Sequence, residues 1–205
     1  YRSCNFSVCK LRAFYLQNIK MKKILNLLFI ISSIFCYSQK YIDGIIIKKD
    51  NDTVNSKIRI STNIFNKKII DERSFYDVLV LVNENGERKE VIKTQNIKEL
   101  RFTDFNGKDR IYIDDKGTFR RLMFSGEKTK WFRDIVVNSY DGSITYADYL
   151  VYKDGQELKI GGGFTNTKKM LIKATAAKPE LENQIKIMER FSDEYIVNLL
   201  KKYDQ

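Results

Sequence analysis

The chain of 205 residues contains no histidine, only three cysteines and a single proline. Without an imidazole it cannot use the serine or cysteine mechanisms in which histidine is the base. The cysteines, Cys4, Cys9 and Cys36, all lie in the first 38 residues, so the rest of the chain has no disulfide, thiol nucleophile or Cys/His zinc site. Hydrolysis by paired carboxylates and a Ca²⁺ site built from oxygens remain possible.

Residues 21–38 have the composition of a secretory signal peptide. Lys22 and Lys23 precede a 12-residue, mostly apolar run at 24–35. Twelve helical residues rise about 18 Å, which is too short to span a hydrocarbon layer about 30 Å thick. Small residues at Cys36 and Ser38 predict cleavage before Gln39. We therefore expect an exported protein that is periplasmic, associated with the outer envelope, or secreted.

Two further expectations concern the segment before Gln39. Lipid attachment at Cys36 is the less favoured alternative, because Ser33, Ile34 and Phe35 match poorly the Leu-small-small triplet that precedes a lipidated cysteine. Residues 1–20 begin with Tyr and precede Met21, which has its own export signal behind it. We expect residues 1–20 to be an upstream, non-native extension and exclude them from the fold prediction.

The strong positive charge belongs largely to the segment before Gln39. The whole chain has 37 Lys/Arg and 26 Asp/Glu, and residues 1–38 hold six of the basic residues and none of the acidic ones. The remaining 167 residues therefore carry about +5, a weak argument for nucleic acid. This length predicts one domain over 39–205, and no Ser/Gly/Pro tract indicates a linker.

From residue 41 to 160 the sequence consists of short β-rich runs separated by turn residues. The predicted strands are 41–48, 54–60, 78–83, 88–93, 97–102, 110–114, 119–124, 131–138, 143–152 and 157–160, and residues 61–77 have no clear period. Residues 78–82, apolar on both faces, predict a central strand covered on both sides. In 110–114, Ile111 and Ile113 alternate with Arg110, Tyr112 and Asp114, as on a half-buried strand.

Glycines within this region mark the turns between the predicted strands. Four of them follow Asn or Asp, in Asn85-Gly86, Asn106-Gly107, Asp141-Gly142 and Asp154-Gly155. These pairs predict hairpins with type I′ turns, whose central residues both need φ > 0. Glycine spacings of 9 to 21 residues favour antiparallel hairpins over βαβ units. The predicted fold class is mainly β within α+β: an antiparallel meander, sandwich or partly open barrel.

After Gly161-Gly162-Gly163 the apolar period changes to three or four, which predicts two or three helices over about 164–205. The first spans 165–176 with Thr165 as its cap. The second begins near Pro179 and has an apolar stripe of Leu181, Ile185 and Met188. Ser192 caps the last, whose stripe is Ile196, Leu199, Leu200 and Tyr203. Both stripes are narrow, so the helices should pack against the sheet or one another.

Short motifs near both ends of 41–204 resemble a family of uncharacterised exported proteins common in Bacteroidota-type bacteria. Its opening strand and Asp-Thr turn correspond to Gly44-Ile45-Ile46 and Asp52-Thr53 here, and its closing helices to Pro179-Glu180-Leu181 and Tyr203-Asp204. Lys178 departs from the cysteine that often precedes the proline in that family. The resemblance implies export and a hairpin-rich fold with C-terminal helices. It brings no activity that could be transferred.

Three kinds of residue cluster could bind a ligand or act in catalysis, and each could instead have a purely structural role. Gly161–Gly163 could hold a phosphate at a helix N-terminus, although they match no phosphate-loop spacing and favour a flexible joint. Two oxygen-rich groups, Asp50, Asn51 and Asp52, and Asp104, Asn106 and Asp109, could bind Ca²⁺ but favour Asx turns. The carboxylates of Glu127, Asp134, Asp141 and Asp148 could meet across a hairpin but favour surface positions.

The fourth candidate is the basic and aromatic segment 119–133. A ligand surface for an anionic glycan or lipid head group would use Arg120, Arg121, Lys128, Lys130, Trp131 and Arg133. Export argues against nucleic acid as the ligand. The alternative is a pair of strands with aromatics inward and cations in solvent.

No cofactor, metal ligand set or catalytic group is predicted, and three functions remain, the last of which is a purely structural accessory protein with no small ligand. The first is an exported, non-enzymatic envelope protein that binds a partner protein or an anionic envelope component. The second is a glycan hydrolase that works with carboxylates alone.

Overall fold

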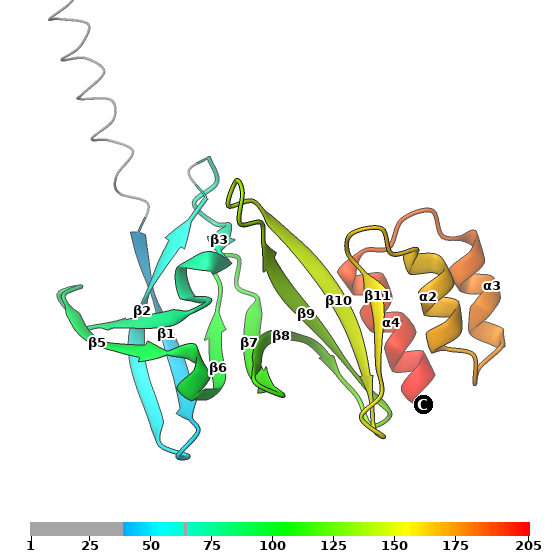
Figure 1. The fold of residues 1–205 in the computed structure, drawn as a ribbon, viewed down its shortest axis with the longest axis horizontal. Helices are drawn as coiled ribbons and strands as arrows, with labels where there is room; N and C mark the ends of the chain where they lie inside the picture. The colour runs from blue at the N-terminus through cyan, green and yellow to red at the C-terminus, as the bar shows by residue number, and fades with distance from the viewer. Residues whose placement is uncertain (1–38, 64) are drawn as a thin grey trace, which may run out of the picture.

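The computed structural model describes residues 39–63 and 65–205, and Figure 1 shows their arrangement. The predicted signal peptide, the upstream extension and Cys36 lie outside the described residues. The described part is mainly β, with an antiparallel sheet of 11 strands that stays open, followed by three helices. None of the described helices is long and apolar enough to cross a membrane.

The elements follow the chain in a simple order. The strands are β1 (Gln39–Lys48), β2 (Thr53–Thr62), β3 (Ile70–Asp71), β4 (Val78–Val82), β5 (Arg88–Lys93), β6 (Ile97–Thr103), β7 (Asp109–Asp115), β8 (Thr118–Ser125), β9 (Thr129–Val137), β10 (Ile144–Tyr152) and β11 (Glu157–Gly161). The helices are α2 (Thr167–Ala174), α3 (Glu180–Ile187) and α4 (Asp193–Asp204), with short 3₁₀ turns η1 (Glu72–Phe75) and η2 (Thr94–Asn96).

The sheet order is β11-β10-β9-β8-β7-β6-β1-β2-β4-β5, and β3 pairs with β2 off this path. Strands β6 to β11 therefore form the predicted meander. The first strands are added on the other side of β6, because the chain returns from β5 at the edge to pair β6 with β1. All ten predicted strands are present, and β3 and η1 occupy the region of 61–77 that had no clear period.

The prediction that residues 78–82 form a central, doubly covered strand is wrong. Strand β4 lies next to the edge strand β5, and only Leu79, Leu81 and Val82 are buried. In β7 the buried face is also the opposite of the one predicted from the isoleucines. Tyr112 is the buried residue, whereas Ile111 and Ile113 are only partly covered on the opposite face. The Tyr112 ring packs between Phe75, Phe102 and Phe119, whose stacking outweighs the aliphatic alternation.

The hairpins occur where predicted, but their turn type differs. In the Asn85-Gly86 turn only Gly86 has positive φ, and its N–H donates to the Asn83 carbonyl at 3.0 Å. This is the three-residue loop in which a type I turn precedes a left-handed glycine. Both central residues have positive φ at Lys116 and Gly117, which join β7 to β8. Positive φ at both central residues, as a type I′ turn requires, therefore occurs where neither of them is Asn or Asp.

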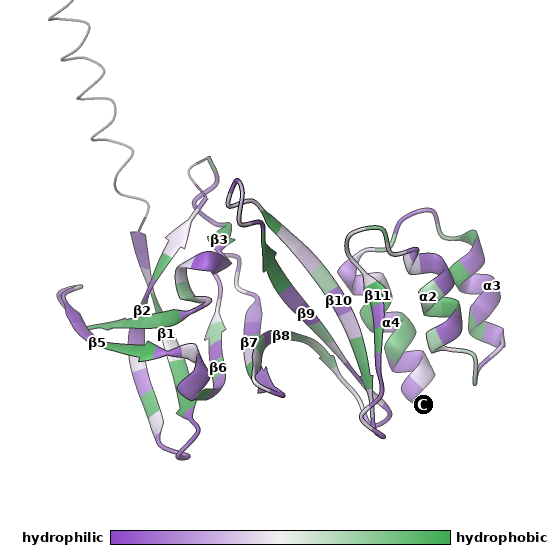
Figure 2. Cartoon of the chain, in the orientation of Figure 1, coloured by the Kyte–Doolittle hydropathy of each residue, from purple (hydrophilic) through white to green (hydrophobic). Residues whose placement is uncertain are grey.

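Helices α2 and α4 begin at polar caps, and one of these two caps is the predicted residue. Ser192 accepts a hydrogen bond from the Tyr195 N–H and caps α4, which confirms the prediction. The cap of α2 is Asn166, not Thr165, because the Asn166 side chain accepts from the Lys169 N–H. On α3 and α4 the buried stripe residues are Leu181 and Ile185, and Ile196, Leu199 and Leu200. Figure 2 shows hydrophilic residues along the remaining surfaces of these helices.

The sheet supports two separate hydrophobic cores. The first lies among β1, β2, β4, β5, β6, β7, β8 and η1 and uses residues 42–119. The second uses Trp131, Leu150 and Ile160 of β9, β10 and β11 with the apolar stripes of the three helices. Strands β8 and β9 connect the two cores (Figure 1).

Candidate functional site

The segment 119–133 does not present the ligand surface that its composition suggested. Trp131 has no exposed area, because its ring belongs to the second core and its Nε1 donates to Asp148 at 3.1 Å. Phe119 and Phe132 are buried as well. The alternative prediction, a pair of strands with aromatic rings inward and cations in solvent, is therefore correct about these rings. It is wrong about the arginines, which lie in ion pairs.

Arg133 is the centre of the first ion-pair cluster. Its Nε lies 2.8 Å from Asp148 Oδ1, and its Nη2 lies 2.8 Å from Asp193 Oδ1 at the start of α4. Its guanidinium also lies over the rings of Trp131 and Tyr146. Burial opposes the charge of Arg133, but its hydrogen bonds to Asp193 and Asp148 outweigh burial and raise its pKa. This arginine fastens the helices to the sheet and is unavailable to a ligand.

Arg120 holds a second cluster on the opposite face of the sheet. Its guanidinium nitrogens lie 2.8 Å from Asp115, 2.9 Å from Asp134 and 2.9 Å from Glu157. Burial raises the pKa of Asp134, and the negative charge of nearby Glu157 adds to this rise against the pull of Arg120. Sequence reasoning missed this cluster because its members come from β7, β8, β9 and β11, whose registers the sequence does not give.

The remaining cations of the segment are scattered. Arg121 Nη1 lies 3.5 Å from the buried carboxylate of Glu72, which also pairs with Arg110 at 2.8 Å. Lys128 donates to the Tyr203 carbonyl at 3.1 Å and lies over the Tyr203 ring. Lys130 is exposed. Arg120, Arg121, Lys128, Lys130, Trp131 and Arg133 therefore do not form one exposed surface.

The four predicted carboxylates are not brought together. Asp134 and Asp148 lie on adjacent strands, but each is bound to a different arginine on a different sheet face. Glu127 lies in the turn before β9, and Asp141 lies in the hairpin after it. Asp141 Oδ1 accepts from the Ser143 N–H at 2.9 Å. Asp134, Asp141 and Asp148 therefore each have a different partner.

The oxygen-rich groups form Asx turns, as the structural alternative predicts. Asp50 Oδ1 accepts from the Asp52 N–H at 3.0 Å. Asp104 Oδ1 accepts from the N–H groups of Asn106 and Lys108, and its Oδ2 pairs with Arg110 at 2.8 Å. Within residues 39–63 and 65–205, no group of three or more acidic side chains is arranged to hold a metal ion.

The glycines after β11 serve close packing. Gly162 has φ +91°, and a Cβ at this position would lie 2.8 Å from Ala147 Cα and would collide with the Tyr146 carbonyl oxygen. Gly163 also has positive φ but has open space around it. The chain therefore turns tightly against β10 at Gly162. Helix α2 starts only at Thr167.

An open groove of about 720 Å³ lies on the outer face of β1, β2, β6 and β7. Its floor follows the strand register: Asn55, Ile45, Arg101 and Ile111 lie side by side in one row. A second row contains Lys57, Asp43, Thr103 and Asp109. Ile45 is 45% exposed at the centre of the floor.

The charges of the groove are balanced. The lining residues include three acidic ones, Asp43, Glu84 and Asp109, and three basic ones, Lys57, Arg101 and Arg110. The Lys57 ammonium pairs with Glu84, and Arg101 pairs with Glu99 beside the groove. Sequence reasoning missed this surface, although three successive isoleucines, Ile45 to Ile47, place apolar side chains on both faces of β1. An apolar centre with paired charges around it suits a protein surface better than an anionic ligand.

Comparisons with known proteins identify no relative. No family model, no curated protein and no solved structure matches the chain. The groove is therefore the candidate functional site on its geometry alone.

Proposed function

We propose that the protein is an exported, non-enzymatic binding module that engages a partner protein through the groove over β1, β2, β6 and β7. One observation carries the proposal: the groove is open and has an exposed isoleucine at its centre, among acidic and basic side chains in equal number. Exposed apolar residues ringed by polar groups are typical of protein contact sites. The signal-like segment 21–38 and the resemblance to exported proteins support the extracytoplasmic location.

Charge favours a protein over the anionic envelope component. An anionic glycan or head group requires an excess of basic side chains, whereas the groove contains as many acidic as basic residues. The arginines that would have supplied such an excess, Arg120 and Arg133, are held in ion pairs elsewhere.

The hydrolase alternative receives less support. Asp43 and Asp109 share the groove, but both are exposed. Catalysis by a carboxylate pair needs one carboxyl group that stays protonated as the general acid, which is achieved in a partly buried, apolar environment. An open face with exposed carboxylates favours binding over hydrolysis.

The proposal is tested by affinity capture from the organism that encodes the chain, with Ile45→Glu and Ile187→Glu as a matched pair. Both isoleucines are exposed, but Ile187 lies on α3 and outside the groove. We expect a protein that is retained by the wild type and by Ile187→Glu but lost with Ile45→Glu. If the wild type and both variants retained the same protein equally, or if the wild type retained none, the groove would not be the binding site.

Export is tested separately by mass spectrometry of the natural protein. We expect an N-terminus at Gln39 in the extracytoplasmic fraction. A cytoplasmic protein in which Cys36 is still joined to the preceding residues would reject export without bearing on the groove.

A further inference from the structure

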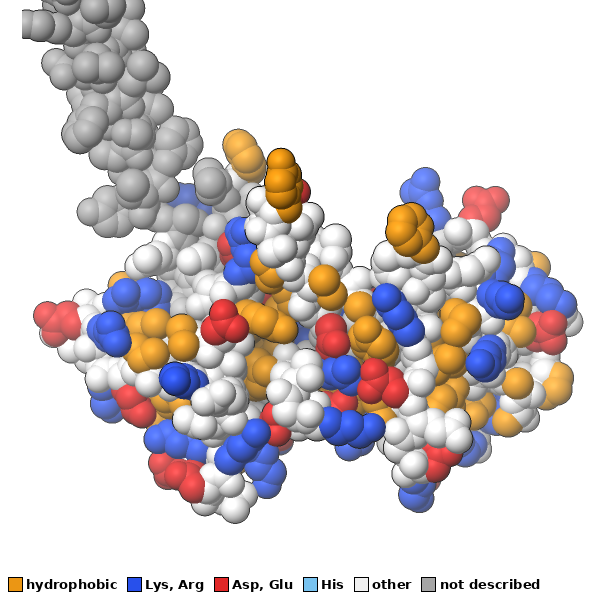
Figure 3. Space-filling view, viewed as in Figure 1, with side chains coloured by type: hydrophobic (Ala, Val, Ile, Leu, Met, Phe, Trp, Pro, Cys, Tyr) orange, Lys and Arg blue, Asp and Glu red, His pale blue; other side chains and the backbone are white. Residues whose placement is uncertain are grey.

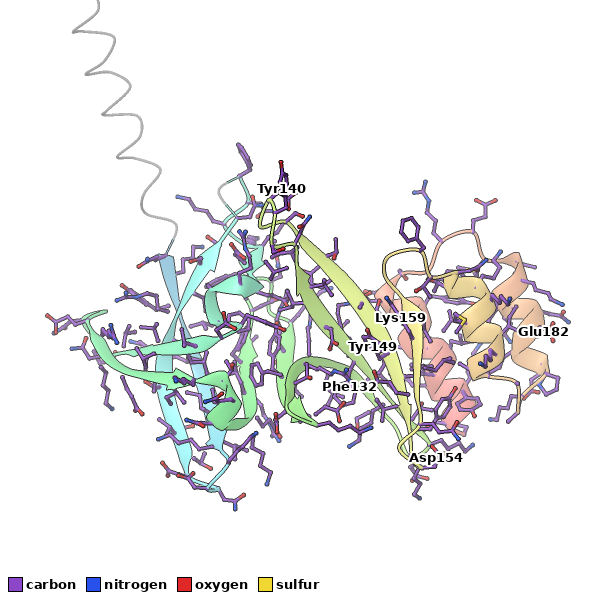
Figure 4. All side chains as sticks on the ribbon, viewed as in Figure 1. Phe132, Tyr140, Tyr149, Asp154, Lys159 and Glu182 are labelled. Carbon is purple, nitrogen blue, oxygen red and sulfur yellow. The ribbon has the colours of Figure 1, made fainter. Side chains whose placement is uncertain are left out.

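Three loops project aromatic side chains into solvent, and none of these side chains lines the groove. They are the loop between β2 and β3, the hairpin between β9 and β10, and the loop between β11 and α2. Phe65 and Tyr140 are 95% and 97% exposed, and Phe164 is fully exposed. Figure 3 shows hydrophobic side chains protruding in three places along one edge of the molecule, and Figure 4 labels Tyr140 there. We call this edge, with Phe65, Tyr140 and Phe164, the loop edge.

Specific contacts fix the positions of these loops. Arg73 Nη1 in η1 donates to the Gly142 carbonyl at 2.7 Å, while Arg73 Nη2 pairs with Asp71 at 2.6 Å. This bridge joins the region after β3 to the β9–β10 hairpin. On the other side, Gly162 packs against the backbone of Tyr146 and Ala147 in β10. The aromatic tips are therefore held on one edge by the fold and are not independent ends.

The surroundings of two of the tips are apolar and basic. Ile69, Val136 and Val137 are also exposed beside Phe65 and Tyr140 in the chain. Lys67 and Lys68 are exposed in the β2–β3 loop, and they form no ion pair with any residue of 39–63 and 65–205. Asp71 is occupied by Arg73, and Asp141 by the Ser143 N–H. The positive charge near Phe65 is therefore uncompensated.

Exposed aromatic rings on separate loops, with lysines beside them, suit a lipid surface better than a rigid protein partner. Isolated side chains that stand out from separate loops need a matching hollow for each ring in a rigid partner. A fluid bilayer accepts them without such a match, and aromatic rings are enriched in the interface between hydrocarbon and water. Lysines beside the rings would add attraction to anionic lipids.

We propose that the loop edge rests on a lipid bilayer with anionic head groups, and that Phe65, Tyr140 and Phe164 enter the head-group region. Lys67 and Lys68 would lie against the lipid phosphates. The chain enters β1 at Gln39 on this same edge (Figure 1). This surface and the groove are different parts of the molecule, so the inference goes beyond the proposed function and does not depend on it.

The first test locates the bilayer contact with tryptophan reporters. Phe65→Trp and Phe164→Trp place the reporter on the loop edge, and Lys153→Trp places it at the β10–β11 hairpin, whose Asp154 lies at the opposite edge (Figure 4). Trp131 is buried and gives the same background in each variant. With vesicles of phosphatidylcholine and phosphatidylglycerol, we expect a blue shift at Phe65→Trp and Phe164→Trp only. No shift at either residue, or the same shift at Lys153→Trp, would overturn the proposal.

The second test measures affinity by co-sedimentation with the same vesicles. The triple variant Phe65→Ala, Tyr140→Ala and Phe164→Ala should bind at least about tenfold more weakly, because burial of even one aromatic ring is worth that much. Lys67→Glu with Lys68→Glu should weaken binding to the anionic vesicles, and the wild type should bind pure phosphatidylcholine vesicles more weakly than it binds the anionic ones. Equal binding of the wild type and the triple variant would contradict the insertion of the rings.

Two controls separate this proposal from folding and from the groove. All three rings are exposed, so the urea midpoint of the triple variant should equal that of the wild type. Ile45→Glu should bind vesicles as the wild type does. Vesicle binding lost with Ile45→Glu but kept in the triple variant would assign the bilayer contact to the groove and reject the loop edge.

Discussion

Arg133 on β9 forms a two-pronged ion pair with Asp193, the first residue of α4. Nη1 donates to Oδ2 at 2.9 Å and Nη2 donates to Oδ1 at 2.8 Å. The same guanidinium donates from Nε to Asp148 on β10. One side chain thus joins two strands of the sheet to the start of the last helix, over the ring of Trp131. Its removal should affect the packing of the second core.

Arg133→Met is expected to lower the free energy of unfolding by about 3 kcal/mol, because it leaves the mostly buried carboxylate of Asp148 without its cation. Urea unfolding followed by the fluorescence of Trp131, the single tryptophan, measures this loss. Lys186→Met is the control, since Lys186 and Glu182 form an exposed pair on α3 whose loss should cost less than about 0.5 kcal/mol. A similar loss in both variants would contradict the role given to Arg133.

Asp104 should make stability depend on acid pH. Burial opposes its ionisation, but hydrogen bonds from the Lys108 N–H, from Arg110 and from the Asn106 N–H outweigh burial and lower its pKa. The ionised form is therefore stabilised in the folded state. This contribution is present above the unfolded pKa of about 3.9 and is lost as the pH falls through the lower folded pKa.

Asp104→Asn tests this dependence. We expect the variant to be about 2 kcal/mol less stable than the wild type at pH 7, because the amide gives a weaker partner to Arg110 and cannot accept at both oxygens. The difference should shrink when urea unfolding is repeated at pH 4 and then pH 3. A difference that stays constant across this range would show that the ionised carboxylate is not the source of the stability.

Gly162 and Gly163 offer a matched test of backbone packing after β11. Gly162→Ala should cost about 3 kcal/mol, because it adds a collision with the β10 backbone to the strain of positive φ. Gly163→Ala carries only the strain and should cost about 1 kcal/mol. Urea midpoints of the two variants give the comparison. Equal losses would mean that β10 yields to the new methyl group.

The sequence predicted the local parts of the fold well, because alternation, glycine turns and helix caps act over a few residues. Ser192 and the ten predicted strands are examples. It failed where distant pairing decides the outcome. The position of β4 near the edge depends on the return of the chain to β6, and the burial of Tyr112 depends on Phe75, which lies 37 residues earlier.

At the candidate sites, too, contacts between near neighbours in the chain could be predicted and contacts between distant residues could not. Asx turns at Asp50 and Asp104 could be anticipated from neighbours two residues away. The partners of Arg120 and Arg133 could not, because Glu157 and Asp193 come from elements 37 and 60 residues further along. A basic and aromatic composition alone cannot distinguish an exposed ligand surface from cations that join two packed layers.

The division of the apolar residues into two cores affects the order in which the chain can fold. The first core is complete at Phe119, and the second begins at Trp131. Strands β1 to β8 can therefore collapse around Phe75 and Tyr112 while α2, α3 and α4 are still being synthesised. Until those helices arrive, the Trp131 face of β9 and β10 stays uncovered, and this is the stage at which the growing chain is most prone to aggregate.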